Sequence, residues 1–324
     1  MSLWANVRQR YGSTLLWRFG RPALRIARLG AASASLYTIG YSEGMKQVLT
    51  EPHDTLRQLV ERTLASQAHG ASTLDAAQPD ARLVSRIGHE LLEAARAYLV
   101  ELEETASTAE ERGEAAKKLK RLQSLAWHFV VIDDGTVNAF VNDMLPGYVF
   151  VHRGLLRALN HREDELSFII GHELSHYLHD HGSEARKLGG LFSALSLVLL
   201  ATADPTGILS AALELPVAAS LFSLVVVLPM SREAEREADA LGLELLARTC
   251  RSPDGALRAQ ERLAAFEAAH GGDPSVTSIV SSHPATMERL LDMRRQLPAA
   301  HATYSASGCA AKKRALWFAY RAAS

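Results

Sequence analysis

The sequence predicts a mainly α-helical protein that also contains a small β-sheet. In the stretches 54–125 and 231–270, apolar residues recur every three or four positions, which is the spacing of amphipathic helices. Between them, short runs rich in β-branched residues alternate with turn signals over 127–152, which predicts two or three strands. A chain of 324 residues can form one large or two modest domains. Its net charge of −1 gives no electrostatic argument for a nucleic-acid partner.

The first 45 residues differ in composition from the rest of the chain. Residues 1–42 contain no Asp or Glu, and their arginines are Arg8, Arg10, Arg18, Arg21, Arg25 and Arg28. An arginine-rich, acid-free segment with interleaved serines is typical of a mitochondrial transit peptide, and a basic tail is the alternative. Residues 29–42 carry no charge but fall short of the about 20 apolar residues of a membrane helix. We therefore expect 1–45 to be a targeting segment with a weak membrane anchor.

Residues 46–125 are expected to form a helical region. The stretches 54–67 and 80–104 have helical spacing of apolar residues, and each begins with an Asp that can cap the helix, Asp54 or Asp80. The charged stretch 106–123 then predicts either a solvated helix or a linker.

The next stretch predicts short strands followed by two helices. The apolar run WHFVVID (127–133) ends in an Asp-Asp-Gly turn signal, and VNAFVND (137–143) and YVFVH (148–152) follow it. A short helix over 154–159 should end at Asn160, and a longer helix over 162–181 should close at Gly182.

An apolar insert separates this helix from the acidic helix expected over 231–248. Its two arms, 188–203 and 215–230, contain no charged residue, but each is shorter than a membrane span. We expect a re-entrant hairpin or helices buried against the rest of the protein. A further helix over 252–270, a loop containing SSHPATMERLLDMRRQL and a basic tail over 299–324 complete the chain. Cys250 and Cys309 are expected to be two ordinary thiols, because two cysteines this far apart do not make a disulfide scaffold.

The longer helix contains the pattern His-Glu-x-x-His at residues 172–176. Histidines four positions apart on a helix lie on one face, where both can bind one metal ion, and Glu173 can reach a water on the open side of that ion. The pattern follows the apolar run 168–170, as expected for a site on a core helix. His179 and His181 are expected to be polar residues at the helix end, near the negative pole of its dipole.

A catalytic zinc ion needs a third protein ligand, and the acidic helix offers candidates. Glu235 and Asp239 are four positions apart, so one carboxylate can bind the metal while the other accepts a hydrogen bond from a ligand imidazole. The alternative is a solvated acidic helix, because Glu233 and Glu237 lie on the same stretch.

Together these motifs resemble the HtpX-like and CAAX-prenyl-protease-like zinc metallopeptidases. The resemblance rests on His-Glu-x-x-His, on Glu235-x-x-Ala-Asp239, on His283-Pro284, and on Asn138-Ala139-Phe140 before Pro146-Gly147. It implies a zincin-like metallopeptidase core over 126–298 that carries the apolar insert at 188–230. It also implies one Zn²⁺ per chain, with a function for each motif residue. The implied ligands are His172, His176 and Glu235, the general base is Glu173, Asp239 supports a ligand, and His283 stabilises the oxyanion.

Within that family, the chain is similar to the stress proteases of the mitochondrial inner membrane whose activity overlaps with the m-AAA protease. This likeness implies a zinc-dependent endopeptidase that cleaves membrane-tethered proteins in mitochondrial quality control, including a dynamin-like fusion GTPase. It implies contact with a membrane and no nucleic-acid partner, and it leaves open whether the protein forms a homo-oligomer. The alternatives are a bacterial-type envelope metalloprotease, a non-catalytic chaperone or scaffold that retains zinc, and a structural membrane-hairpin protein. A fluorescent reporter fused to residues 1–45 would separate the mitochondrial from the envelope reading.

Overall fold

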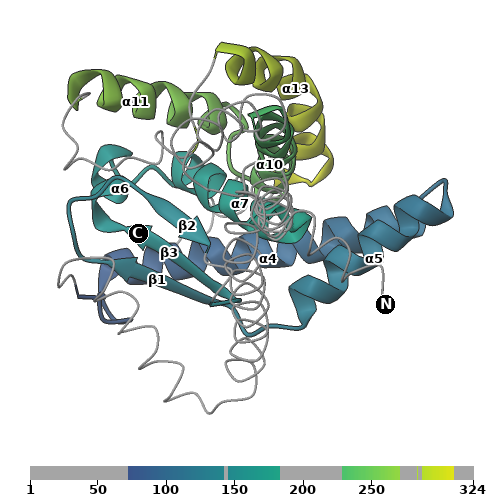
Figure 1. The fold of residues 1–324 in the computed structure, drawn as a ribbon, viewed down its shortest axis with the longest axis horizontal. Helices are drawn as coiled ribbons and strands as arrows, with labels where there is room; N and C mark the ends of the chain where they lie inside the picture. The colour runs from purple at the N-terminus through teal and green to yellow at the C-terminus, as the bar shows by residue number, and fades with distance from the viewer. Residues whose placement is uncertain (1–71, 142–144, 183–227, 271–282, 284–286, 310–324) are drawn as a thin grey trace, which may run out of the picture. The chain divides into compact units, whose positions relative to one another are not determined.

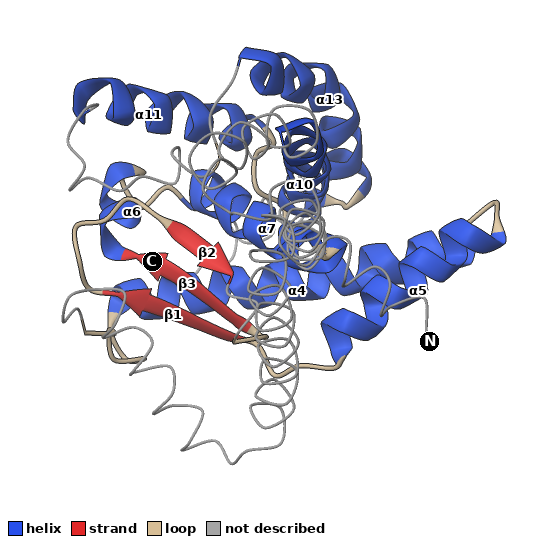
Figure 2. Ribbon diagram, viewed as in Figure 1, coloured by secondary structure: helices blue, strands red, loops and turns tan. Residues whose placement is uncertain are grey.

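The computed structural model describes residues 72–141, 145–182, 228–270, 283 and 287–309. These residues form helices joined to a small sheet, which confirms the expected mainly α-helical class with a small β-sheet (Figures 1 and 2). The elements are α4 (Pro79–Thr105), α5 (Ala109–Gln123), β1 (His128–Ile132), β2 (Ala139–Val141), β3 (Tyr148–His152), α6 (Arg153–Ala158), α7 (Glu163–His179), α10 (Leu228–Arg248), α11 (Asp254–His270) and α13 (Met287–Ala306). Contacts divide the chain into two units, and 57–181 with 232–324 form the unit described here.

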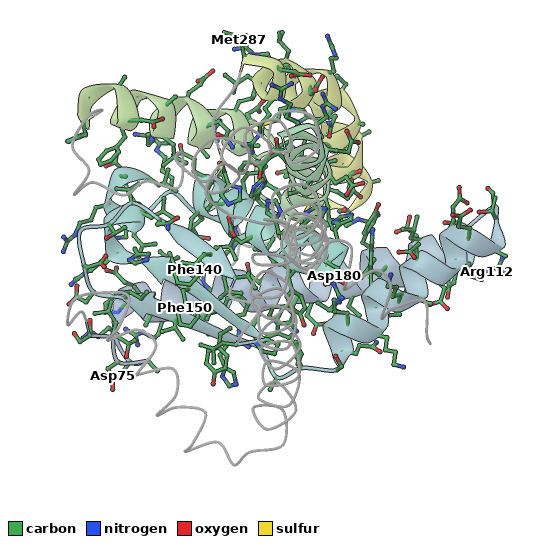
Figure 3. All side chains as sticks on the ribbon, in the orientation of Figure 1. Asp75, Arg112, Phe140, Phe150, Asp180 and Met287 are labelled. Atoms are coloured by element: carbon green, nitrogen blue, oxygen red, sulfur yellow. A yellow bond between two sulfur atoms is a disulfide. The ribbon has the colours of Figure 1, made fainter. Side chains whose placement is uncertain are left out.

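The three strands form a mixed sheet with the order β1-β3-β2. β1 runs parallel to β3, with Val130 opposite Phe150, and β2 runs antiparallel to β3, with Phe140 opposite the same residue. The rings of Phe140 and Phe150 stack with centroids 5.0 Å apart, and Figure 3 labels both. Within the described sheet β2 is therefore an edge strand, and it contacts α7.

Helix α4 packs against the sheet and α7 through one apolar face. Its residues Val84, Ile87, Leu91, Ala95 and Leu99, at the helical spacing expected from the sequence, are all at most 1% exposed. Gln78 stands at the N-cap without a side-chain bond, and Pro79 follows it, so Asp80 is not the capping residue that we expected. Instead, Asp80 lies 2.9 Å from the guanidinium of Arg153, which ties the start of α4 to the start of α6.

The charged stretch after α4 forms a helix rather than a linker. Thr108 and Glu111 make a capping box: the Thr108 side chain accepts from the Glu111 backbone, and the Glu111 carboxylate accepts from the Thr108 backbone. Acidic residues stand in its first turn and basic residues in its last, which suits the helix dipole.

Two short segments end as the sequence predicts. Asn160, with a φ of 50°, follows the end of α6. The turn 133–135, which follows β1, lies directly against the start of the same helix. A Cβ atom at Gly154 would lie 2.2 Å from the carbonyl oxygen of Gly135, so only glycine fits there.

The end of the described chain differs from our expectation. Residues from Met287 onward were expected to be a loop and then a tail, but they form helix α13, which continues to Ala306 despite Pro298 inside it. The buried side chains of Arg289, Met293 and Ala300 give this helix a packed face, which outweighs the local effect of the proline.

The prediction of two ordinary thiols was wrong, because Cys250 and Cys309 form a disulfide. α13 returns to the end of α10, so two residues separated by 59 positions have Cα atoms only 5.0 Å apart. Spacing in the sequence did not reveal this approach, since it depends on how the helices pack.

We expect the double variant Cys250→Ser with Cys309→Ser to lose about 4 kcal/mol of unfolding free energy, because the bond closes a long loop in the unfolded chain. Urea unfolding with and without dithiothreitol measures this loss. The reductant should lower the midpoint of the wild type and leave that of the variant unchanged. Equal midpoints for both proteins in oxidising buffer would contradict the expectation.

The expected membrane segments lie outside the described residues, both the run 29–42 and the insert up to residue 227. Across the part of the chain that the structure describes, no helix combines the length and apolar character required to cross a bilayer.

Candidate metal centre

Helix α7 places His172 and Glu173 in the interior of the described unit and leaves His176 partly buried. His172 and Glu173 are 2% and 3% exposed, and the helix is buried along most of its length. One helical turn separates His172 from His176, so their Nε2 atoms approach to 3.0 Å. Glu163, Asp164 and Glu165 in the first turn favour helix formation at this point in the chain.

Helix α10 brings Glu235 to these imidazoles. Glu235 Oε1 lies 3.3 Å from His176 Nε2, and Glu235 Oε2 lies 3.5 Å from His172 Nε2. The helices come this close because of Gly242, where a Cβ atom would lie 3.1 Å from the backbone nitrogen of His172. A larger residue there would push α10 away from the histidines.

Asp239 lies one turn after Glu235 and faces the other side of His172. Its Oδ1 is 3.0 Å from His172 Nδ1, while the Nε2 atom of the same ring points to Glu235. This arrangement is the one in which a carboxylate orients a ligand imidazole and leaves its second nitrogen for a metal. The solvated-helix alternative does not apply to Glu235 and Asp239, which are 7% and 3% exposed.

His283 contacts the same group of residues. Its Nδ1 lies 2.6 Å from Glu235 Oε1 and 3.5 Å from His172 Nε2, and its Nε2 lies 3.7 Å from Glu173 Oε1. Ligand atoms of His172, His176, Glu235 and His283 all fall within 4.8 Å of one another. His283 thus lies between the candidate ligands and Glu173, where it can contact a group bound on the open side.

Arg289 is a residue of this centre that our sequence analysis missed. Its guanidinium binds Asp239 through Nε and Nη2 at 2.8 and 2.7 Å, and its Nη1 lies 2.8 Å from Glu235 Oε2. A bidentate arginine fixes the plane of a carboxylate, so Arg289 holds both acidic groups in place. In the sequence, its one signal is a position six residues after His283, which does not distinguish it from other arginines.

The contacts of His181 were also missed. His179 and His181 were expected only as polar residues near the helix end, and both do lie there. α7 ends at His179, earlier than Gly182, and Asp180 adopts a left-handed φ of 65°. His181 Nδ1 then lies 2.9 Å from His176 Nδ1, and its Nε2 lies 2.9 Å from Glu237 Oε2. Burial lowers the pKa of His179 to about 4, with the nearby Lys118 acting in the same direction, so the helix dipole does not dominate there.

The electrostatics of the centre favour a positive charge between the carboxylates. Burial opposes protonation of His172, but the hydrogen bonds that its ring donates to Asp239 and Glu235 outweigh burial and raise the pKa of His172 to about 9. Burial likewise acts to raise the pKa of Glu235, yet its three histidine neighbours bring that pKa well below the ordinary value. The pKa of His176 is lowered by burial and by the charge on His172. A cation bound here would replace the proton that His172 otherwise carries.

The donor set fits a zinc ion. Two atoms bound at about 2.1 Å to a tetrahedral ion lie about 3.4 Å apart, close to the separations between the two imidazoles and Glu235. Two histidines and one glutamate form a known catalytic zinc set with an open fourth position. In addition, Glu173 Oε1 is buried without a hydrogen-bond partner among the described residues, which suits a carboxylate that binds a water or substrate group.

The comparisons with known proteins agree with this chemistry. A family model described as "Peptidase family M48" matches residues 103–296. The chain is 32% identical over 189 residues to the mitochondrial metalloendopeptidase OMA1 of Schizosaccharomyces pombe, which covers 58% of this chain and 52% of that protein. It is 27% identical over 194 residues to the human mitochondrial metalloendopeptidase OMA1, covering 58% of this chain and 35% of that protein.

A bacterial protein is also similar. The protease HtpX homolog of Streptococcus uberis is 28% identical over 219 residues, covering 51% of this chain and 65% of that protein. The chain spans about half the length of the yeast relatives that it matches. The matched region contains His172, His176, Glu235 and His283, so it includes the whole candidate metal centre.

Proposed function

Because the chain belongs to peptidase family M48, we propose that it is a zinc-dependent endopeptidase. The observation that carries this proposal is the convergence of His172, His176 and Glu235 next to the buried carboxylate of Glu173. Glu235 lies 59 positions after His176, on a different helix, so local clustering of polar residues in the sequence does not explain their contact.

In the proposed site, the two imidazoles and Glu235 hold one zinc ion. Asp239 orients His172, and Arg289 holds Asp239 and Glu235 in place through the contacts described above. When bound, Zn²⁺ supplies a Lewis acid that polarises a peptide carbonyl and makes water more acidic.

Glu173 is proposed as the general base, and later as the acid that protonates the leaving amine. Its carboxylate is nearly fully buried, and Oε1 has no hydrogen-bond partner within the described residues, so it is free to accept a proton from an attacking water. His283 lies 3.7 Å from Glu173 and is proposed to donate a hydrogen bond to the oxygen that becomes negative during attack.

The edge of the sheet offers a place for an extended substrate. β2 pairs with β3 on one side, and within the described sheet its other side has no paired strand. Because β2 also contacts α7, a peptide added to this edge would pass beside the helix that carries Glu173. Backbone hydrogen bonds would then position the scissile bond without reading its side chains.

We propose membrane-tethered proteins in mitochondria as substrates, in quality control at the inner membrane. The similarity to the mitochondrial metalloendopeptidases OMA1 of Schizosaccharomyces pombe and human supports the mitochondrial location, and the arginine-rich, acid-free N-terminus agrees with it. A dynamin-like fusion GTPase as one substrate, and assembly into a homo-oligomer, rest on the resemblance of the sequence motifs alone.

Removal of the metal tests the proposed function. We expect 1,10-phenanthroline to abolish cleavage of a membrane-tethered reporter, and we expect about one equivalent of Zn²⁺ to restore it. Gel analysis of the reporter measures cleavage, and elemental analysis of the same samples measures zinc. A serine-protease inhibitor is the control and should have no effect. Cleavage that continues after the zinc content has fallen to background would rule out the proposal.

A further inference from the structure

Each candidate ligand imidazole has a separate partner on its second ring nitrogen. For His172 this partner is Asp239, as the sequence motifs predicted. For His176, Nε2 faces Glu235 and Nδ1 faces His181, which none of the motifs assigned. A metal-binding histidine requires such a partner, since the group on the second nitrogen determines which tautomer forms and how the ring is oriented.

The local backbone brings His181 to this position. α7 ends at His179, and the left-handed conformation of Asp180 turns the chain so that His181 folds back toward His176. The turn is held by Arg121 of α5, whose guanidinium lies 2.8 Å from the Asp180 carboxylate. The His181 side chain is only 10% exposed, so water competes weakly for its contact with His176.

Glu237 determines the tautomer of His181. Its Oε2 lies 2.9 Å from His181 Nε2, and a carboxylate oxygen can only accept, so the proton belongs on Nε2. His181 Nδ1 is then a lone-pair acceptor, which faces His176 Nδ1 at 2.9 Å. His176 must therefore carry its proton on Nδ1, and its Nε2 lone pair points toward His172 and Glu235. This assignment satisfies the contacts among Glu237, His181 and His176 Nδ1 with both rings neutral, and it leaves the His176 Nε2 lone pair, which faces Glu235 Oε1, for a metal ion.

We propose that His181, oriented by Glu237, is a positioning residue that holds His176 in the tautomer able to bind zinc. This inference rests on the proposed zinc site and adds two residues to it. Glu237 is half-exposed, with 47% of its side chain accessible, so its effect should be smaller than that of the nearly buried His181.

Three variants test the proposed positioning role of His181 and Glu237 in the full chain. Zinc affinity is measured by competition with a chromogenic chelator. His181→Phe removes the acceptor and should weaken zinc binding roughly 10–100-fold. His181→Asn keeps an oxygen acceptor close to the position of Nδ1, so it should recover most of that loss. Glu237→Gln still accepts from His181 Nε2, and we expect a smaller loss than for His181→Phe.

Matched controls separate positioning from folding. Glu233→Gln lies one turn before Glu237 on α10 and pairs with Arg236, and His301→Phe alters an exposed histidine on α13, so both should bind zinc as the wild type does. The thermal midpoint of each metal-free variant should equal that of the metal-free wild type. A long-range ¹H–¹⁵N spectrum of the zinc-loaded protein should show His176 protonated at Nδ1.

Several results would overturn the proposed positioning role of His181. The proposal fails if His181→Phe binds zinc as tightly as the wild type, or if Phe and Asn at this position weaken zinc binding equally. It also fails if the zinc-loaded spectrum shows His176 protonated at Nε2. In each case the wild type still binds zinc, so the proposed function stands. Absence of zinc binding by the wild type itself would overturn the proposed function, and the positioning role of His181 with it.

Discussion

Replacing Glu173 by Gln is expected to lower cleavage of a membrane-tethered reporter at least roughly 100-fold, because the amide cannot take a proton from water. The two side chains have nearly the same size, and the buried Oε1 position is filled in both, so the fold should be retained. Glu173 is not among the candidate ligand atoms, and the variant should therefore keep about one zinc ion per chain. Cleavage rate and zinc content measured on the same preparation give both results.

Glu267→Gln is a suitable control, since this glutamate lies on α11, which contributes no residue to the candidate metal centre, and should be neutral in both assays. A chaperone or scaffold that only retains zinc predicts equal behaviour of Glu173→Gln and the wild type. Equal cleavage by the two proteins would therefore reject the endopeptidase reading. Loss of zinc together with activity would instead assign Glu173 a role in holding the metal.

The second large effect is expected for Glu235→Ala, which should reduce zinc after dialysis from about one ion per chain to background. The change leaves the two imidazoles as the remaining members of the proposed ligand set. It also removes the carboxylate that faces Arg289 Nη1 at 2.8 Å, which leaves a buried charge with less compensation. Elemental analysis of dialysed protein measures the zinc, and reporter cleavage should disappear with it.

Glu233→Ala is the matched control, because Glu233 lies on the same helix two positions earlier and pairs with Arg236 at the surface. It should keep both zinc and activity. Full zinc content in Glu235→Ala would show that this carboxylate is not a ligand, and the proposed site would then lack its third donor.

Helices and short strands could be predicted because their signals are local. Val84, Ile87 and Leu91 recur at helical spacing, and the strand 128–132 is apolar and followed by a turn sequence. Helix boundaries were less accurate. Gln78 with Pro79 begins α4 before Asp80, and the left-handed Asp180 ends α7 before Gly182. α13 was missed because the prolines at 284 and 298 weaken the local helical signal in the sequence, whereas packing of the helix stabilises it.

The residues of the candidate site likewise fall into those that local sequence signals predicted and those that only the tertiary contacts identify. Spacing alone identified His172, Glu173 and His176, because one helical turn guarantees that the two imidazoles share a face. The later acidic helix suggested Glu235 and Asp239 only in combination with that motif. Arg289 and His181 had no such signal, since each is recognised by the atoms that it contacts and not by its distance along the chain.

By itself the sequence determined most of the elements, the histidine pair and the type of chemistry, since these depend on neighbours within a few positions. Tertiary structure alone decided which of the acidic residues meets the imidazoles, that Cys250 reaches Cys309, and that Arg289 joins Asp239 to Glu235. The physical reason is that such contacts depend on how closely helices pack. At Gly242 that packing depends on a missing Cβ atom, and its consequence for His172 lies seventy positions away in the sequence.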